Sequence, residues 1–205
     1  MIGVLAAFGA VACASSEPEL APTPSVDVLR QAGDWPPHPA PAAVVRLTLQ
    51  GCIQDIGHAP VVASEDRGFG VYFVLFGDAQ TAGLCEVRQD ASGSLSDVGG
   101  GAGGIGQRRG DAIVVASWDA RPDRSFVMGV TPIGASAIRA VVGSHAVDGT
   151  VGGELFVVAW PNREPASLVV ALDANHHEIA RLDGDELARL FAPSCLPGSL
   201  QPCTP

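Results

Sequence analysis

The chain has 205 residues, and its 22 acidic and 12 basic side chains give a formal net charge of −10 at pH 7. Every basic residue is an arginine, so the chain cannot form a lysine Schiff base or a lysine-containing phosphate loop. The net negative charge and the lack of a cluster of basic residues also argue against a nucleic-acid partner, because binding to phosphates needs clustered positive charge.

The N-terminus predicts export. Residues 2–12 are apolar or small and are followed by Cys13, a pattern that is too short to span a membrane but typical of a secretory signal. Ala10–Cys13 fits the lipobox of bacterial lipoproteins, in which Cys13 is lipidated; ordinary cleavage before Ser15 is the alternative. We favour the lipobox and expect residues 1–14 to be a signal peptide. The protein would then be held on the extracellular face of the cell membrane, or be secreted if the alternative applies.

A proline-rich stretch follows the signal. Seven of the sixteen prolines lie between residues 15 and 41, which predicts an extended tether rather than a regular helix or sheet. Within it we expect one helical turn at residues 25–30, and we expect Trp35 to pack back on the domain. The folded domain would then comprise residues 42–205.

Four cysteines remain after Cys13. An even number in an exported chain indicates two disulfides. Three connectivities are possible, and we favour a long loop plus a short C-terminal clasp. A zinc site is the alternative, but the sequence has neither C-x2-C nor H-x3-H spacing. The favoured pairs are Cys52–Cys85 and Cys195–Cys203.

Residues 41–53 allow two secondary structures. A proline at the start and the spacing of Val45, Leu49 and Ile53 favour a helix with one buried stripe. The alternation of Val45, Leu47 and Leu49 favours a strand instead. We favour the helix.

Beyond Gly57 the sequence predicts strands. Residues 71–76 are β-branched, aromatic or leucine, and residues 84–88 alternate as their partner. The run at 155–160 is apolar on both faces, so we place it centrally in a sheet. In addition to 71–76 and 84–88, six strands are expected, at Ile113–Trp118, Phe126–Val130, Ala137–Val142, Leu155–Trp160, Leu168–Leu172 and Glu178–Leu182.

This pattern predicts a mainly β fold, an antiparallel sandwich or a curled sheet. The chain would close with a short helix at residues 187–191. Asp183 would cap this helix and Glu186 would complete a capping box.

Short motifs in residues 124–182 resemble a module of exported proteins and membrane-tethered ectodomains of GC-rich Gram-positive bacteria. That module has an Asp-Gly turn in a hairpin and a strand that ends in Ala-Trp-Pro. The resemblance implies an immunoglobulin-like β module outside the cell, and it supplies no catalytic residues. The matching positions are Gly129, Asp148, Gly149, Thr150, Val151, Phe156, Ala159, Trp160 and Pro161, with Glu65–Gly68 and Cys85 upstream.

Residues 101–106 read Gly-Ala-Gly-Gly-Ile-Gly, a formal G-x-G-x-x-G. A dinucleotide site needs a strand before this motif and a helix after it. The preceding residues are rich in glycine and serine, and no apolar helical stripe follows. We therefore predict a flexible surface loop, with neither a nucleotide partner nor a cofactor.

Other candidate chemistry is better explained by turns and caps. His176, His177 and Glu178 lie where a hairpin turn belongs, and neighbouring histidines on a strand point apart, so we predict no metal site. Residues 143–145 read Gly-Ser-His and are interpreted as a turn, since no nucleophile elbow is present.

One surface remains as a candidate for binding. Trp118 lies at a strand end beside Asp119 and Arg121, and we predict that Trp118 and Arg121 contribute to a binding surface. The function expected from the sequence is therefore a lipid-anchored, non-enzymatic envelope module that binds or senses a protein or glycan. The alternatives are an envelope-acting hydrolase with a dispersed site and a purely structural or interaction domain.

Overall fold

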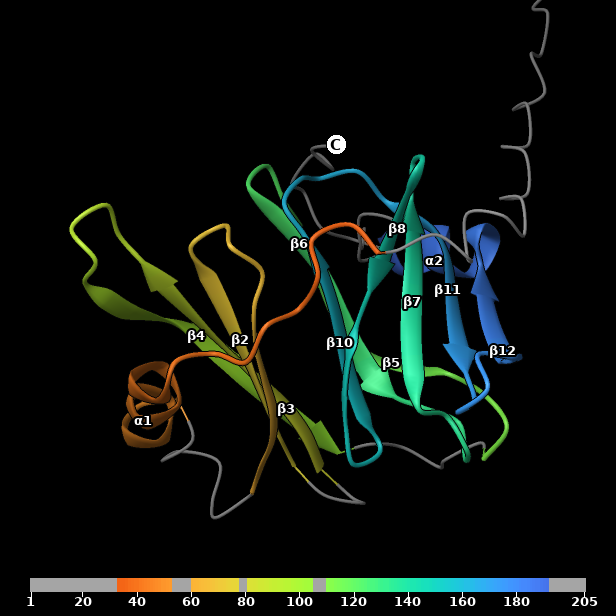
Figure 1. Cartoon of the computed structure of the whole chain (residues 1–205), viewed down its shortest axis with the longest axis horizontal. Coiled ribbons are helices and arrows are strands. Elements are labelled where there is room, and N and C mark those ends of the chain that lie inside the picture. Colours follow the sequence, from red (N-terminus) through yellow and green to blue (C-terminus); the bar gives the residue numbers. More distant parts are fainter. Residues whose placement is uncertain (1–32, 53–59, 78–80, 105–109, 192–205) are drawn as a thin grey trace, which may run out of the picture.

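Three antiparallel four-stranded sheets make up most of the computed structural model, which describes residues 33–52, 60–77, 81–104 and 110–191. Two helices accompany the sheets (Figure 1). The prediction of a mainly β fold with antiparallel sheets, a sandwich or a curled sheet, is confirmed.

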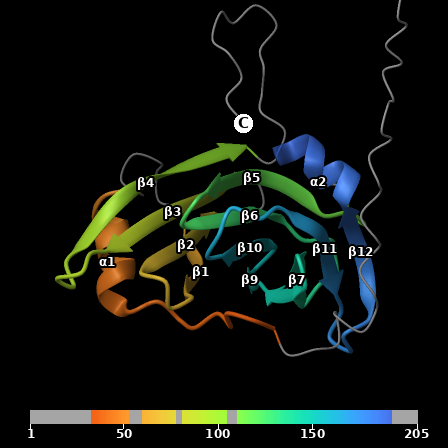
Figure 2. The ribbon, with the colours of Figure 1, turned by 90° about the horizontal axis from the view of Figure 1, so that it is seen from above.

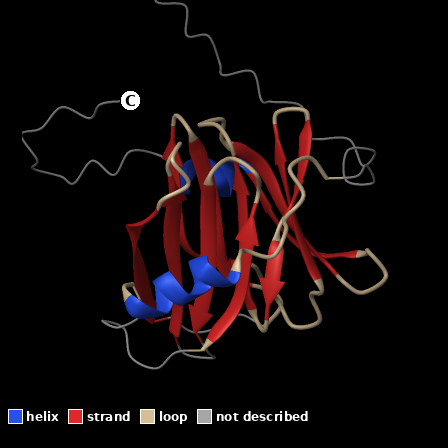
Figure 3. Cartoon of the chain, turned by 60° about the vertical axis from the view of Figure 1, so that its left-hand side comes forward, coloured by secondary structure: helices blue, strands red, loops and turns tan. Residues whose placement is uncertain are grey.

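The N-terminal sheet is a meander in the order β1-β2-β3-β4. Side chains alternate along β2, so that Phe73 and Leu75 face one layer while Val74 and Phe76 face the other. Helix α1 covers this second face, as Figure 3 shows from the side of the helix. The elements are α1 (Ala42–Gln50), β1 (Val61–Asp66), β2 (Val71–Gly77), β3 (Thr81–Gln89) and β4 (Leu95–Gly104).

The middle sheet has the order β5-β6-β10-β9. The predicted central position of residues 155–160 is confirmed, because β10 pairs with β6 and β9 and all six of its residues are buried. The strands are β5 (Val114–Arg121), β6 (Arg124–Val130), β9 (Thr150–Gly152) and β10 (Leu155–Trp160).

The C-terminal sheet has the order β12-β11-β7-β8. Helix α2 follows β12 directly, and the predicted cap is present, since the backbone N–H of Glu186 donates to Asp183 Oδ1 at 3.3 Å. The elements are β7 (Ala137–Val142), β8 (His145–Asp148), β11 (Ala166–Leu172), β12 (Glu178–Asp183) and α2 (Gly184–Phe191).

The middle sheet lies between the other two and is packed on both faces (Figure 2). Phe156, Val158 and Trp160 of β10 join the C-terminal sheet in one apolar core. Leu155 and Val157 of the same strand join the N-terminal sheet in a second core. The double burial of β10 explains why its sequence is apolar at every position.

The helix favoured within residues 41–53 is present as α1, which ends at Gln50. The expected buried stripe is wrong, because Val44 and Thr48 are buried while Leu49 is exposed. The buried hydroxyl of Thr48 donates to the carbonyl of Val44 at 3.0 Å, which satisfies it within the helix. The disulfide Cys52–Cys85 is formed with a Cα–Cα distance of 6.1 Å and ties the end of α1 to β3. Cys195 and Cys203 lie outside the described residues.

The prediction of a flexible surface loop at residues 101–106 is wrong for residues 101–104, which belong to β4 and pair along β3. A side chain at Gly100 would collide with Cys52 Sγ and the Leu84 carbonyl. Glycine is therefore required there because the disulfide lies directly against the strand, a reason that local composition does not reveal.

The end of the proline-rich stretch runs along the domain. Asp34 forms a parallel bridge with Val147 of β8, and His38 forms an antiparallel bridge with Asp66 of β1. Residues 33–41, called the strap below, thus connect the edges of the C-terminal and N-terminal sheets. Trp35 packs against the core next to the C-terminal sheet, as predicted. Among the residues described, no helix is long and apolar enough to cross a membrane.

Candidate functional site

The two residues predicted to bind a ligand lie on β5 and have different surroundings. Trp118 is partly buried and packs against the core between the middle and C-terminal sheets. The side chain of Arg121 is 50% exposed, and its Nε donates to Asp119 Oδ2 at 2.8 Å. Trp118 therefore contributes to the core, while Arg121 belongs to a network of charged side chains.

This network lies at the β5–β6 hairpin and contains three guanidinium groups and three carboxylates. Arg124, only 1% exposed, donates through Nη1 to Asp119 at 3.0 Å and through Nη2 to Glu86 of β3. Its guanidinium carbon also lies 5.4 Å from the ring centroid of Phe126. The members of this hairpin network are Arg88, Arg121, Arg124, Glu86, Asp119 and Asp123.

The arginines and carboxylates of the hairpin network neutralise one another's charge. Arg88 donates to Glu86 at 3.2 Å and to Asp123 at 2.7 Å. Desolvation raises the pKa of Asp123, but the hydrogen bond and charge of Arg88 outweigh it, so the net pKa lies below the usual value. Because Arg124 is on β6 and Glu86 is on β3, the network joins the middle and N-terminal sheets.

A second charged cluster lies where the strap crosses β1. Glu65 is fully buried, and Arg67 binds both of its carboxylate oxygens, at 2.9 and 3.1 Å. Thr150 of β9 donates to the same carboxylate. Glu65, Arg67 and Thr150 all belong to the motifs that carry the family resemblance. The structure brings them together as an interior ion pair, an arrangement that holds elements in place.

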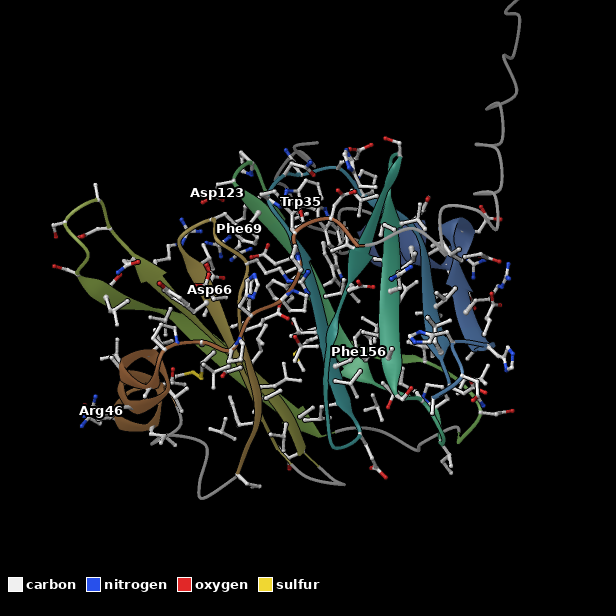
Figure 4. The ribbon with its side chains drawn as sticks, in the orientation of Figure 1. Trp35, Arg46, Asp66, Phe69, Asp123 and Phe156 are labelled. Carbon is white, nitrogen blue, oxygen red and sulfur yellow. A yellow bond between two sulfur atoms is a disulfide. The ribbon has the colours of Figure 1, made fainter. Side chains whose placement is uncertain are left out.

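The Glu65–Arg67 pair also fixes the strap. Arg67 Nη1 donates to the carbonyl of Trp35 at 2.9 Å. Trp35 has a φ of 48°, a left-handed conformation that is rare for a bulky residue and costs about 1–3 kcal/mol. Its ring lies 5.0 Å from that of His145, whose Nδ1 is 3.0 Å from Asp34 Oδ2. Figure 4 labels Trp35 of the strap and Asp66 of β1.

A cavity of about 480 Å³ opens between the edge strands β5 and β12, beside α2. Ile113 and Leu182, which belong to or pack against the core between these sheets, contribute to its lining. Arg181 is engaged by Glu178 in a two-pronged ion pair, at 2.5 and 2.7 Å. The volume of the cavity lies within the range of small-molecule sites, and its lining combines five apolar residues with three charged ones. Its remaining lining residues are Ala112, Val114, Val115, Glu186 and Arg189.

The residues interpreted as turns form turns. His176 has a φ of 62° in the β11–β12 hairpin, and Asp173 Oδ1 accepts from the backbone N–H of Asn175 and His177, each at 2.8 Å. Gly143 and Ser144 connect β7 to β8. In the described ranges no three His, Cys, Asp or Glu side chains are grouped so that they could hold a metal ion. Cys13 lies outside those ranges.

Comparison with family models, with curated proteins and with solved structures finds no match to this chain.

Proposed function

We propose that this protein is an exported module, anchored to the outer face of the cell membrane by a lipid on Cys13, that binds or senses an envelope protein or glycan without catalysing a reaction. The resemblance to exported and membrane-tethered proteins of GC-rich Gram-positive bacteria, with their immunoglobulin-like β module, belongs to the same proposal.

The observation that carries the proposal is the Cys52–Cys85 disulfide. Cys85 is fully buried in the layer between α1 and the N-terminal sheet. Disulfides form and persist in oxidising compartments outside the cytosol. A buried disulfide therefore supports the export that the apolar N-terminus and Cys13 predict.

A binding role is supported by how the charged groups are used. Arg124 of β6 binds Glu86 of β3, and Arg67 binds Glu65 of β1 and the carbonyl of Trp35 in the strap, so these carboxylates have structural partners. The cavity beside β5 is instead lined by five apolar residues together with Arg181, Glu186 and Arg189. A concave site that combines apolar side chains with a few charged groups is the usual form of a small-molecule binding site.

Mass spectrometry of the protein recovered from membranes tests the anchor. We expect a diacylglyceryl mass on Cys13, and we expect Cys13→Ser to release the protein into the medium. A mature chain with a free Ser15 N-terminus would contradict the anchor.

Co-sedimentation with isolated cell-envelope material tests the binding role. We expect the protein to sediment and Arg189→Glu in the cavity to reduce the bound fraction at least threefold. Arg163→Glu, in the exposed turn after β10, is the matched control and should leave binding unchanged. Equal loss in both variants would show that only net charge matters, and absence of sedimentation would contradict an envelope partner.

A further inference from the structure

The C-terminal sheet has an apolar side that faces away from the core. Along β7 and β11 side chains alternate, so Ile138, Ala140 and Val169 point into the core beside the middle sheet. The intervening side chains form a separate buried cluster on the opposite side of the sheet. We call this set the outer apolar face; its members are Ala137, Val141, Leu168, Val170 and Leu172, with Ala146 of β8 opposite Val141.

The outer apolar face is shielded from solvent. Val141 is 1% exposed, Leu168 is 3%, Val170 is 0% and Leu172 is 7%. Side chains on an uncovered sheet face keep much of their surface in contact with water, so values this low require a cover.

The described helices and strands lie elsewhere. Helix α1 lies on the N-terminal sheet, and Leu187 of α2 packs into the core on the inner side of the C-terminal sheet. The middle sheet also packs on that inner side. Figure 2 accordingly shows β11 and β12 at the rim of the layers, with the other labelled elements on their inner side. Among the described elements, none is thus placed to cover the outer apolar face.

The first residues of the strap lie at this face. The backbone N–H of Asp34 donates to the carbonyl of Ala146 in β8, at 2.6 Å. Gly33 lies against the carboxylate of Asp148, where an added Cβ would collide with it. Asp148 in turn binds Arg139, and these two residues are cross-strand partners on the same side of the sheet as Val141. Gly33 therefore sits beside the outer apolar face and not beside the core.

We propose that residues 20–32 of this chain dock on the outer apolar face. This stretch contains Leu20, Val26, Val28 and Leu29, which supply the apolar surface that the face needs. Thirteen residues can extend over about 40 Å, whereas four strands about 4.8 Å apart span about 15 Å. The segment that ends at Gly33 is therefore long enough to cross the whole sheet.

Docking would shorten the free segment between Cys13 and the domain, a consequence that rests on the proposed lipid anchor. Between Cys13 and Gly33 there are 33 − 13 = 20 residue steps, about 60 Å at the 3.1 Å per residue of a proline-rich chain. With residues 20–32 docked, 20 − 13 = 7 steps remain, about 20 Å. The C-terminal sheet would then be the side of the domain nearest the membrane.

Thiol labelling of Leu168→Cys, introduced into the full chain, tests the docking. The rate of alkylation by iodoacetamide is followed by peptide mass spectrometry, which separates this thiol from those of the native cysteines. We expect at least tenfold slower labelling in the full chain than in a chain that begins at Gly33. Val28→Asp combined with Leu29→Asp should also release the protection. Thr23→Asp combined with Ser25→Asp adds the same charge to the same segment and should preserve it.

Each outcome of the labelling experiment supports or overturns the docking of residues 20–32. Fast labelling in the full chain, or equal protection in both double variants, would overturn it. Protection that persists in the shortened chain together with a dimer mass by light scattering would show that a second copy covers the face instead. If the shortened chain does not fold, the two double variants decide. The purified chain is used without its lipid, so failure of the docking would leave the mass-spectrometric test of Cys13 unaffected.

Discussion

Replacing Arg67 by methionine should be among the most destabilising single substitutions in the domain. The substitution keeps an unbranched apolar stem but removes both hydrogen bonds to Glu65, whose side chain is fully buried. Removing one partner of a buried pair leaves an uncompensated charge and costs about 3–5 kcal/mol. The carbonyl of Trp35 loses its donor as well, which adds about 1 kcal/mol. This loss approaches the whole stability of a marginal domain, about 5–15 kcal/mol.

Urea unfolding measures this effect, with the free energy taken from the midpoint and the slope. Adding Glu65→Gln to Arg67→Met removes the stranded charge and should restore at least half of the lost stability. The matched control is Arg181→Met, because Arg181 binds Glu178 with the same two-pronged geometry but is 50% exposed; there we expect a loss below about 1 kcal/mol. Equal losses at Arg67 and Arg181, or a double variant no more stable than Arg67→Met, would refute the reasoning.

Three further predictions concern the N-terminal sheet. The double variant Cys52→Ser/Cys85→Ala opens a disulfide with a sequence separation of 33, and calorimetry should show a loss of about 3–4 kcal/mol; an unchanged Tm would contradict this. Gly100→Val should prevent formation of that disulfide, because the new side chain collides with its sulfur; normal oxidation by peptide mapping would show that the strand can move. Hydrogen bonds from Ser92 lower the pKa of the exposed Asp90, so its contribution to stability is present above the unfolded pKa and is lost as pH falls through the folded pKa. Ser92→Ala should therefore raise the Asp90 pKa in an NMR titration, and an unchanged value would contradict this assignment.

Strands with a clear apolar signal were predictable from the sequence. The expected strands at 71–76 and 155–160 are β2 and β10, nearly to the residue. Both are continuous apolar runs whose side chains are buried on two faces, and such runs bounded by turn residues allow few other structures. The helix α1 was predictable because Pro41 directly precedes its first residue, and proline is frequent at the start of helices.

Four strands were not predicted, and each lacks an apolar signal for a physical reason. Strand β4 is half glycine, and its Gly100 lies directly against the disulfide. Strands β8 and β9 have four and three residues and are edge strands of their sheets. Strand β1 contains Glu65, whose buried charge is matched by Arg67. A single sequence does not show that a buried carboxylate has a partner, so a charged residue gives no signal of a buried strand.

The stacking of the three sheets was also not predictable from a single sequence. Alternation predicts that a strand has two faces, but it does not show which other sheet each face meets. Apolar burial is non-directional and stabilises many stacking geometries of similar area. In this domain the specific links between layers are polar: Arg124 to Glu86 joins β6 to β3, and Thr150 to Glu65 joins β9 to β1. Glu65, Glu86, Arg124 and Thr150 are thus best explained as connectors of layers, and a buried charge in such a domain is evidence of how its sheets stack before it is evidence of chemistry.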